Sequence, residues 1–277
     1  MLLVKLPEPV RETQKPTYMP PMGLWSIEHS AWMAGHEAKT IDCHLRGNLN
    51  ALEEELGKGW DMIGLSAQFS IQHDAYAEAA RMCSERTDAE VVAGGFHAAA
   101  VSAPPGVDRV VRGEGEGAMA QGIGAAGYPW NMASRMGPYW AKGSPHDLQS
   151  KTGSWMPVEF SRGCNRGCGY CGVDRFWGPS RYFPMESIIR HLDDLALDGI
   201  EEVFIEDDNF ASDPEIFKAI VGELGRRGLW WSMPNGIYAR RLPGNAAMLA
   251  KSGCWRVSLP FETGTEGTAR LMGLGSK

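Results

Sequence analysis

Three cysteines within eight residues carry the clearest chemical signal in the sequence. Cys164, Cys168 and Cys171 have the spacing C-x3-C-x2-C in a glycine-rich segment that directly follows an expected strand. Three thiolates can hold three irons of a four-iron cubane and leave the fourth iron open, whereas electron-transfer clusters usually take four cysteines. The triplet therefore predicts an iron–sulfur cluster with one iron available for chemistry.

Zinc is the alternative occupant of this segment. A structural zinc site would need a fourth ligand, for which His191 or Cys254 is available, and paired C-x2-C spacings are more typical of it than one triplet. Six cysteines in 277 residues are too sparse for a disulfide framework. An iron–sulfur cluster is the favoured prediction.

Acidic and aromatic residues accompany the triplet. Glu206 opens the run Glu206–Phe210 after one expected strand, Glu262 lies in the run Phe261–Gly264 after another, and Tyr170 directly precedes the third cysteine. Catalytic groups of barrel folds gather at the carboxyl ends of strands, where a carboxylate can accept hydrogen bonds from an ammonium group. The simpler alternative for both acidic segments is a turn exposed to solvent.

Together these motifs resemble the radical S-adenosylmethionine (SAM) enzymes, whose cysteine loop follows the first strand of a partial TIM barrel. The resemblance implies that the three cysteines hold a [4Fe–4S] cluster and that SAM binds its open iron. It assigns cofactor contacts to Tyr170, Glu206 and Glu262. It also implies an external electron donor of the flavodoxin or ferredoxin type and release of a 5′-deoxyadenosyl radical, with the cofactors supplying the reactivity.

A second group of candidate residues lies in the amino-terminal half. Ser66 and the pair Gly94-Gly95 lie at or just past expected strand ends, and glycines allow a bulky ligand to lie against the backbone. They resemble the cobalamin-binding domain that precedes the barrel in cobalamin-dependent radical SAM enzymes, where a serine and a glycine pair line the slot for the nucleotide tail. The resemblance implies that Ser66, Gly94 and Gly95 bind cobalamin.

His44 lies in a motif that, taken alone, would suggest a cobalt ligand. Residues Asp42–Gly47 spell D-x-H-x-x-G, the cobalt-ligating motif of another cobalamin family. In that family the motif follows the first strand, but here it follows the second. We therefore expect cobalamin to bind without a protein histidine on cobalt and interpret His44 as an ordinary loop residue.

Alternating strands and helices must position the amino-terminal residues. Apolar runs predict five strands, and helical spacing predicts helices at Gly23–Ala34 and Ala75–Arg86, with Cys83 in the core. The expected strands are Leu2–Leu6, Ala38–Asp42, Asp61–Ser66, Glu90–Ala93 and Asp108–Arg112. Such βα units predict a parallel, Rossmann-like (flavodoxin-like) sheet, with its ligand at the carboxyl ends of the strands.

The carboxy-terminal half also has an α/β pattern. Its expected strands are Val158–Phe160, Glu202–Ile205, Trp230–Met233 and Trp255–Pro260. Its expected helices include Ile188–Leu197, with a buried face of Ile188, Leu192 and Leu195, and Ile216–Leu224, with a buried face of Ile216, Ile220 and Leu224. Ser212 or Asp213 could cap the second helix before Pro214. We therefore expect a cobalamin-binding domain at 1–127, a linker at 128–157 and a radical SAM domain at 158–277. Only four of the six βα units of a radical SAM barrel are visible, so this barrel is expected to be incomplete.

Composition narrows the class of protein. The chain has 43% hydrophobic and 22% charged residues, which excludes wholesale disorder, and its net charge of −7 without a basic run argues against nucleic acid as a partner. No apolar stretch approaches the roughly 20 residues of a spanning helix. The sequence predicts a cytoplasmic protein with no membrane partner.

The resemblance favours transfer of a methyl group to an unactivated carbon or phosphorus centre of a small, natural-product-like substrate. A radical cyclisation or rearrangement on the same cofactors is the alternative enzyme class. A methylthiotransferase would need three further amino-terminal cysteines, and only Cys43 and Cys83 are present. The short barrel also leaves open an inactive cofactor-binding fragment or partner subunit, or completion of the barrel by a second chain.

Overall fold

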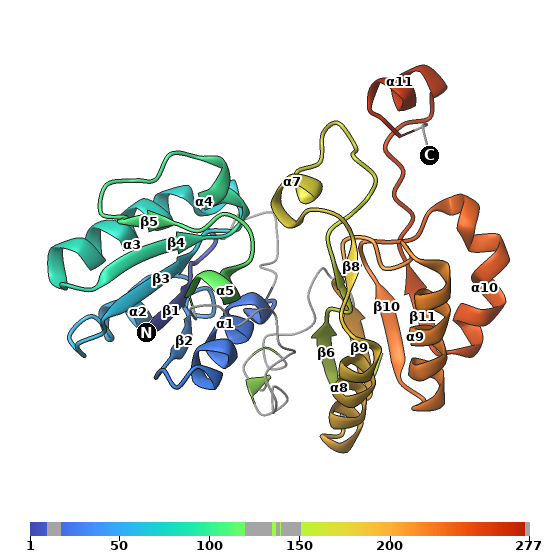
Figure 1. Ribbon diagram of the computed structural model, residues 1–277, viewed down its shortest axis with the longest axis horizontal. Helices are drawn as coiled ribbons and strands as arrows, with labels where there is room; N and C mark the ends of the chain where they lie inside the picture. The colour runs from blue at the N-terminus through green and yellow to red at the C-terminus, as the bar shows by residue number, and fades with distance from the viewer. Residues whose placement is uncertain (10–17, 120–134, 137–138, 140–150, 275–277) are drawn as a thin grey trace. The chain divides into compact units, whose positions relative to one another are not determined.

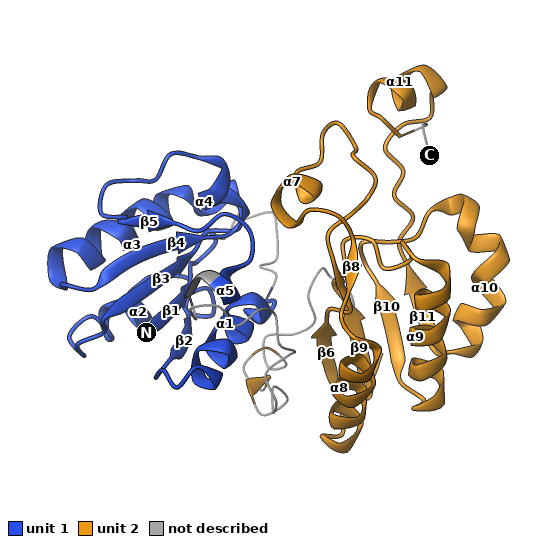
Figure 2. Ribbon diagram, viewed as in Figure 1, with its two compact units in different colours: residues 1–129, 141–148 blue, residues 130–140, 149–277 orange. Residues whose placement is uncertain are grey.

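The computed structural model describes residues 1–9, 18–119, 135–136, 139 and 151–274 and contains two compact units (Figures 1 and 2). Unit 1 comprises residues 1–129 and 141–148, and unit 2 comprises residues 130–140 and 149–277. Each unit is built on its own parallel sheet. Most of the expected linker, 128–157, falls outside the described residues.

Unit 1 confirms the expected doubly wound sheet. Its strands have the order β2-β1-β3-β4-β5, all parallel, which is the flavodoxin-like order. The strands are β1 (Leu2–Lys5), β2 (Lys39–Asp42), β3 (Met62–Ser66), β4 (Glu90–Gly94) and β5 (Arg109–Val110). The helices are α1 (Met22–Met33), α2 (Asn50–Glu53), α3 (His73–Arg86), α4 (Phe96–Ala100) and α5 (Gly115–Met119), with a 3-10 turn η1 (Ser70–Gln72) before α3.

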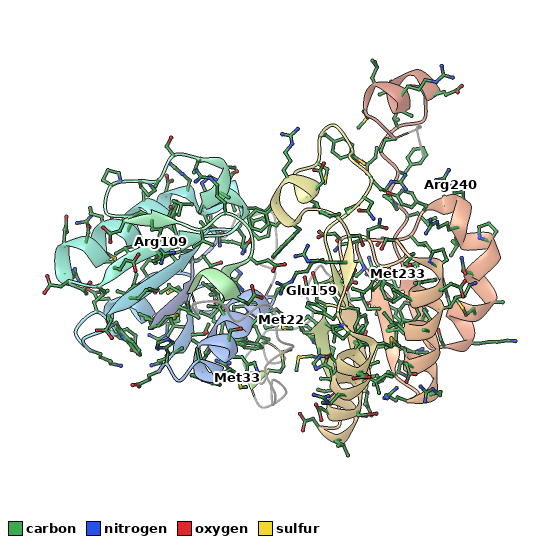
Figure 3. The ribbon with its side chains drawn as sticks, in the orientation of Figure 1. Met22, Met33, Arg109, Glu159, Met233 and Arg240 are labelled. Carbon is green, nitrogen blue, oxygen red and sulfur yellow. The ribbon has the colours of Figure 1, made fainter. Side chains whose placement is uncertain are left out.

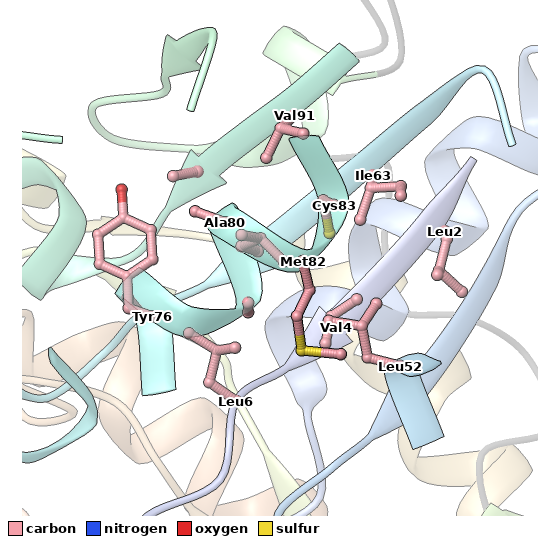
Figure 4. Close-up of a cluster of buried hydrophobic side chains, with 14 of the residues drawn as sticks. Leu2, Val4, Leu6, Leu52, Ile63, Tyr76, Ala80, Met82, Cys83 and Val91 are labelled. Atoms are coloured by element: carbon pink, nitrogen blue, oxygen red, sulfur yellow. The ribbon is translucent and has the colours of Figure 1, made fainter. Parts of the chain in front are cut away.

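Alternation along β1 explains why helices cover both faces of this sheet. Leu2 and Val4 belong to one buried cluster with Cys83 of α3, whereas Leu3 belongs to a second cluster with Leu24 of α1. Successive side chains of a strand point to opposite faces, so an unbroken apolar strand needs cover on each side. Figure 4 shows the first cluster, with Cys83 inside it as expected.

Unit 2 contains a four-stranded parallel sheet with the order β11-β10-β9-β6. Its strands are β6 (Trp155–Val158), β9 (Glu202–Ile205), β10 (Trp230–Met233) and β11 (Cys254–Val257), connected through the helices α8 (Met185–Leu197), α9 (Pro214–Arg226) and α10 (Leu242–Lys251). A 3-10 turn η4 (Ala239–Arg241) precedes α10, and α11 (Glu266–Leu271) follows β11. The three short elements after β6 are β7 (Ser161–Arg162), α7 (Val173–Trp177) and β8 (Arg181–Tyr182).

Several details of unit 2 differ from the sequence expectation, and β11 covers Cys254–Val257 where Trp255–Pro260 was expected. β6 begins at Trp155, three residues earlier than expected, and includes Pro157. Proline is tolerated there because β6 is the edge strand and pairs only with β9. In α9, Phe217 is fully buried where Ile216 was expected to be, and Ile216 is only half-buried.

The start of α9 resolves the two capping alternatives in favour of Asp213. Its side chain accepts hydrogen bonds from the backbone N–H groups of Glu215 (2.9 Å) and Ile216 (3.1 Å), and Pro214 occupies the first turn.

None of the helices that the structure describes is long and apolar enough to cross a membrane.

Candidate functional site

The cysteine loop of unit 2 is an excursion closed at its base by a short antiparallel pair. β7 and β8 pair Ser161 with Tyr182 and Arg162 with Arg181, so residues 163–180 form the loop between them. Gly163 has φ of +83°, and a Cβ there would lie 2.5 Å from the carbonyl oxygen of Gly178. Only glycine fits this closed base.

Arg162 anchors the base through its side chain. Its Nε donates to Glu159 at 2.8 Å, and its guanidinium lies 5.0 Å from the centre of the Trp177 ring and 5.5 Å from that of Phe183. Cation–π contacts are strengthened where the cation is buried, and Arg162 is buried. One side chain therefore connects residues before and after the loop.

The three thiols lie along this loop and are free. Cys164 is half-buried, and burial raises the pKa of its thiol, while hydrogen bonds from the backbone of Arg166 and the side chain of Asn209 act in the opposite direction. The backbone N–H of Cys171 donates to the carbonyl of Cys168 at 3.0 Å, which fixes the turn between them. All three residues are partly accessible, as ligands of an added cluster must be.

Cys254, one candidate for a fourth zinc ligand, begins the strand at the far side of the sheet from β6. Within the described part of the chain, no three His, Cys, Asp or Glu side chains converge on a single metal ion. The Sγ of Cys254 faces the carbonyl of Arg256 at 3.6 Å. A four-iron cluster needs no such convergence, because each cysteine binds a different iron.

Three carboxylates follow β9, and the cysteine loop engages two of them. Asp207 is buried and accepts hydrogen bonds from the backbone N–H of Phe160 (2.8 Å) and the hydroxyl of Ser161. Asp208 accepts one from the backbone of Gly163, and its burial raises its pKa. Both therefore hold the base of the loop.

Glu206 differs from its two neighbours. Its Oε1 is buried and has no hydrogen-bond partner among the described residues. Burial, followed by the charges of Glu159 and Asp208, raises the pKa of Glu206 to about 7. A buried polar atom without a partner calls for an explanation, and a cationic ligand would supply one. Glu159 and Met233, labelled in Figure 3, mark the ends of two of the strands at this edge.

The structure brings Tyr170 and Glu262 together. The Tyr170 hydroxyl hydrogen-bonds to Glu262, and desolvation together with this bond raises the pKa of Tyr170 to about 12. The neighbouring Gly169 donates its N–H to the carbonyl of Met272 at 3.1 Å. The segment around α11 therefore contacts the cysteine loop at two points.

The candidate cobalamin residues also gather at one edge of their sheet. Ser66 ends β3 and is the register partner of Gly94 at the end of β4. Apart from its chain neighbours, a Cβ on Gly94 would meet no atom of the described residues within 4 Å, whereas a Cβ on Gly95, at φ of +99°, would lie 2.5 Å from the carbonyl oxygen of Ala67. Folding therefore requires glycine at 95, while the space beside Gly94 remains open for a ligand.

His44 has a local role in the loop after β2. Its Nδ1 accepts a hydrogen bond from the backbone N–H of Glu8 at 3.1 Å, and its own N–H donates to Asp42 at 2.9 Å. A neutral imidazole that accepts at Nδ1 carries its proton on Nε2, which then offers no lone pair to a metal. These contacts support the interpretation of His44 as a loop residue.

Two features were missed in the sequence. His73 and His97 face each other at 3.1 Å beside the glycine pair, and the Asn235 side chain donates to the backbone carbonyls of Glu206 (3.0 Å) and Asp207 (3.2 Å). His97 directly follows Gly94-Gly95-Phe96, and Asn235 lies two residues past the end of β10. Inspecting every strand end, not only those with acids or glycines, would have found both.

Known families match both units. The Radical SAM superfamily model matches residues 158–277, and the B12 binding domain model matches residues 14–122. A cytidylyl-2-hydroxyethylphosphonate methyltransferase of Streptomyces wedmorensis is 28% identical over 44% of this chain and 23% of its own length. A bacteriochlorophyllide d C-12(1)-methyltransferase of Chlorobaculum tepidum is 26% identical over 49% and 30%. A ribosomal protein uS12 methylthiotransferase of Kineococcus radiotolerans is 34% identical over 22% and 13%.

Solved structures share the fold. The radical SAM methyltransferase TsrM of Kitasatospora setae, with tryptophan and a SAM analogue bound, has a TM-score of 0.72 at 17% identity and covers 97% of this chain and 60% of its own. The cobalamin-dependent SAM radical enzyme OxsB has a TM-score of 0.70 at 15% identity and covers 99% and 45%. The chain thus spans less than a third of the curated relatives and about half of these structures.

A B12-binding domain followed by a radical SAM domain defines the cobalamin-dependent radical SAM proteins. This chain matches models of both domains, in that order. The cofactors of the family are a [4Fe–4S] cluster, SAM and cobalamin, and one TsrM structure holds both the cluster and cobalamin.

Proposed function

We propose that the protein is a cobalamin-dependent radical SAM methyltransferase that acts on an unactivated carbon or phosphorus centre of a small molecule. The three loop cysteines hold the cluster, Glu206 receives the ammonium group of SAM, and Ser66, Gly94 and Gly95 line the cobalamin slot. When bound, the cluster and SAM supply a carbon-centred radical, and cobalamin supplies the methyl group. The relatives named as methyltransferases support this reaction class.

The buried Oε1 of Glu206 is the observation that carries the proposal. A carboxylate with a pKa near 7, whose buried Oε1 has no donor among the described residues, fits a ligand that brings its own positive charge. Asp207 and Asp208 fix the base of the cysteine loop, so Glu206 and the loop are held as one framework. In this framework Glu206 binds and orients SAM, and the closed base of the cysteine loop keeps the thiols in place.

Tyr170 and Glu262 complete the proposed SAM site. Their mutual hydrogen bond joins Glu262 to the loop that carries Cys168 and Cys171. Glu262 is exposed, and one of its oxygens can accept from a ribose hydroxyl while Tyr170 holds the other. We also propose the domain limits 1–127 and 158–277, which agree closely with the spans of the two family models.

Reductive cleavage of SAM tests the proposal without knowledge of the substrate. The protein is reconstituted anaerobically with iron, sulfide and hydroxocobalamin, and 5′-deoxyadenosine is measured after addition of SAM and a strong reductant. We expect its formation by the wild type and its loss in Cys168→Ala, with Cys254→Ala as the matched control that retains it. A full cluster without cleavage would contradict the proposed reaction and leave a cofactor-binding fragment or partner subunit.

A further inference from the structure

The side chain of Asn235 is hydrogen-bonded to the backbone at Glu206 and Asp207. Its Nδ2 donates to two successive carbonyl oxygens, that of Glu206 at 3.0 Å and that of Asp207 at 3.2 Å. An amide nitrogen has two hydrogens, so the two bonds use its full donor capacity. The side chain therefore fixes the turn from which the Glu206 carboxylate projects.

The loop that carries Asn235 is itself fixed from the other side. Gly236 has φ of +87°, and a Cβ there would lie 2.5 Å from the carbonyl oxygen of Ser258. The backbone N–H of Ile237 donates to that same oxygen at 3.1 Å, and the N–H of Ser258 donates to the carbonyl of Met233 at 3.3 Å. Asn235 is thus held against the end of β11 while it holds the end of β9.

This placement matters because of what the end of β9 carries. One oxygen of the Glu206 carboxylate, Oε1, is buried without a partner among the described residues, so no hydrogen bond to this oxygen sets its position. Its direction depends on the backbone beneath it. A shift of that backbone would move the carboxylate, and misplaced binding groups lose much of their effect.

We propose that Asn235 is a positioning residue for SAM, which holds the Glu206 backbone so that the carboxylate meets the ammonium group of the cofactor. The inference rests on the proposed function and deepens it. It assigns to the loop after β10 a part in the SAM site through the main chain of β9, with no direct contact between Asn235 and SAM required.

The test compares SAM with 5′-methylthioadenosine, which lacks the amino-acid portion. Dissociation constants are measured anaerobically on the reconstituted, cobalamin-loaded protein for Asn235→Ala and Asn235→Asp. We expect Asn235→Ala to weaken SAM binding about tenfold, because two hydrogen bonds are lost. Asn235→Asp should be weaker still, since carboxylate oxygens would face carbonyl oxygens. Affinity for 5′-methylthioadenosine and iron content should remain unchanged.

Two controls separate this role from a general loss of structure. Asn245 makes a similar side-chain bond to the carbonyl of Arg241 at 2.7 Å within α10, and Asn245→Ala should leave SAM affinity unchanged. In a Glu206→Gln background, Asn235→Ala should have little further effect, because the carboxylate through which it acts is gone. Additive losses in this double-mutant cycle would overturn the proposal.

The failures of the inference and of the proposed function are distinguishable. Equal SAM affinity in the wild type and both Asn235 variants would remove the positioning role and leave the SAM site standing. A parallel loss of SAM and 5′-methylthioadenosine affinity would also overturn it, because it would show a general disturbance of the site. A wild-type protein that holds its cluster and binds no SAM would remove the proposed function and the inference with it.

Discussion

Both units place their candidate residues at the carboxyl edge of a parallel sheet, but they prepare that edge in opposite ways. In unit 1 the edge has a glycine, Gly94, with open space where a side chain would be. In unit 2 it is made by burying charge: three carboxylates lie after β9 with raised pKa values. The first arrangement suits a bulky ligand and the second a cationic one.

The comparison also separates residues that build an edge from residues that remain available at it. Gly95 and Asp207 are required by the fold, the first by a close backbone contact and the second by its hydrogen bonds to the loop base. The contacts described above do not require Gly94 or the Glu206 carboxylate for folding. In each unit, therefore, the fold itself requires one member of an adjacent pair, and its neighbour is available for binding alone.

Replacement of one loop cysteine should abolish iron binding in unit 2 and leave cobalamin binding in unit 1 unchanged. Cys164→Ala should lose all of the roughly four irons per chain, because a cubane with two protein ligands is not retained. Cobalt after loading with hydroxocobalamin should remain at about one per chain. Iron and cobalt are measured together by inductively coupled plasma spectrometry, with Cys254→Ala as control. Loss of both metals would show that the two edges are not independent.

A side chain at Gly94 should have the opposite effect. Gly94→Leu fills the open space beside β4 and should weaken cobalamin binding by on the order of a hundredfold, since it occupies volume that the ligand needs. Iron content should be unchanged and thermal stability little affected, because among the described residues no atom beyond the chain neighbours lies within 4 Å of the added Cβ. Gly57→Leu, at another glycine with free space, is the control. Retained cobalamin affinity in Gly94→Leu would place the slot elsewhere.

The charge of Glu206 should make SAM binding depend on pH. Its pKa of about 7 in the free protein means that the carboxyl is neutral below this value and charged above it. Because the ammonium group prefers the charged form, SAM affinity should fall as pH drops below 7, approaching tenfold per unit. Glu206→Gln should bind about thirtyfold more weakly at pH 8 and lose this dependence. Equilibrium binding from pH 5.5 to 8 measures both.

The matched control for this change is Glu215→Gln, which removes an exposed carboxylate that pairs with Lys218 on α9. It should leave both SAM affinity and its pH profile unchanged. A Glu206→Gln variant with wild-type affinity and the same pH profile would show that another group receives the ammonium.

Substitution of Gly95, which the fold requires, should reduce stability. Gly95→Ala forces a Cβ against the carbonyl of Ala67 at a positive φ and should lower the free energy of unfolding by about 2 kcal/mol. Gly57→Ala, without a positive φ or a close neighbour, should change it by less than about 0.5 kcal/mol. Urea denaturation followed by circular dichroism measures the difference. Equal stability of the two variants would remove the distinction between Gly94 and Gly95.

Periodic segments of the chain were predictable, and tertiary contacts were not. The strands β9 and β10 have the expected bounds because they are short apolar runs between clear breaks, and α8 buries the expected Ile188, Leu192 and Leu195. The β7–β8 pair was not expected, since two-residue strands carry no periodicity. β6 was predicted to begin late because Pro157 suggested a linker.

In the candidate site, too, local motifs were predictable and tertiary contacts were not. The cysteine spacing and the glycine pair are local patterns, so the sequence reveals them. The hydrogen bond between Tyr170 and Glu262 joins residues 92 positions apart in the numbering, and the contact of Asn235 with Glu206 spans 29. Such contacts depend on which strands become neighbours, which a single sequence does not specify.

The central claim is that the cysteine loop holds a cluster whose fourth iron is open to SAM. The most direct test is the electron paramagnetic resonance spectrum of the reduced, reconstituted protein before and after addition of SAM. We predict a [4Fe–4S]⁺ signal in the wild type, absent in Cys164→Ala, whose g values shift when SAM is added. A zinc-loaded loop without a signal, or a cluster signal that SAM leaves unchanged, would contradict the account.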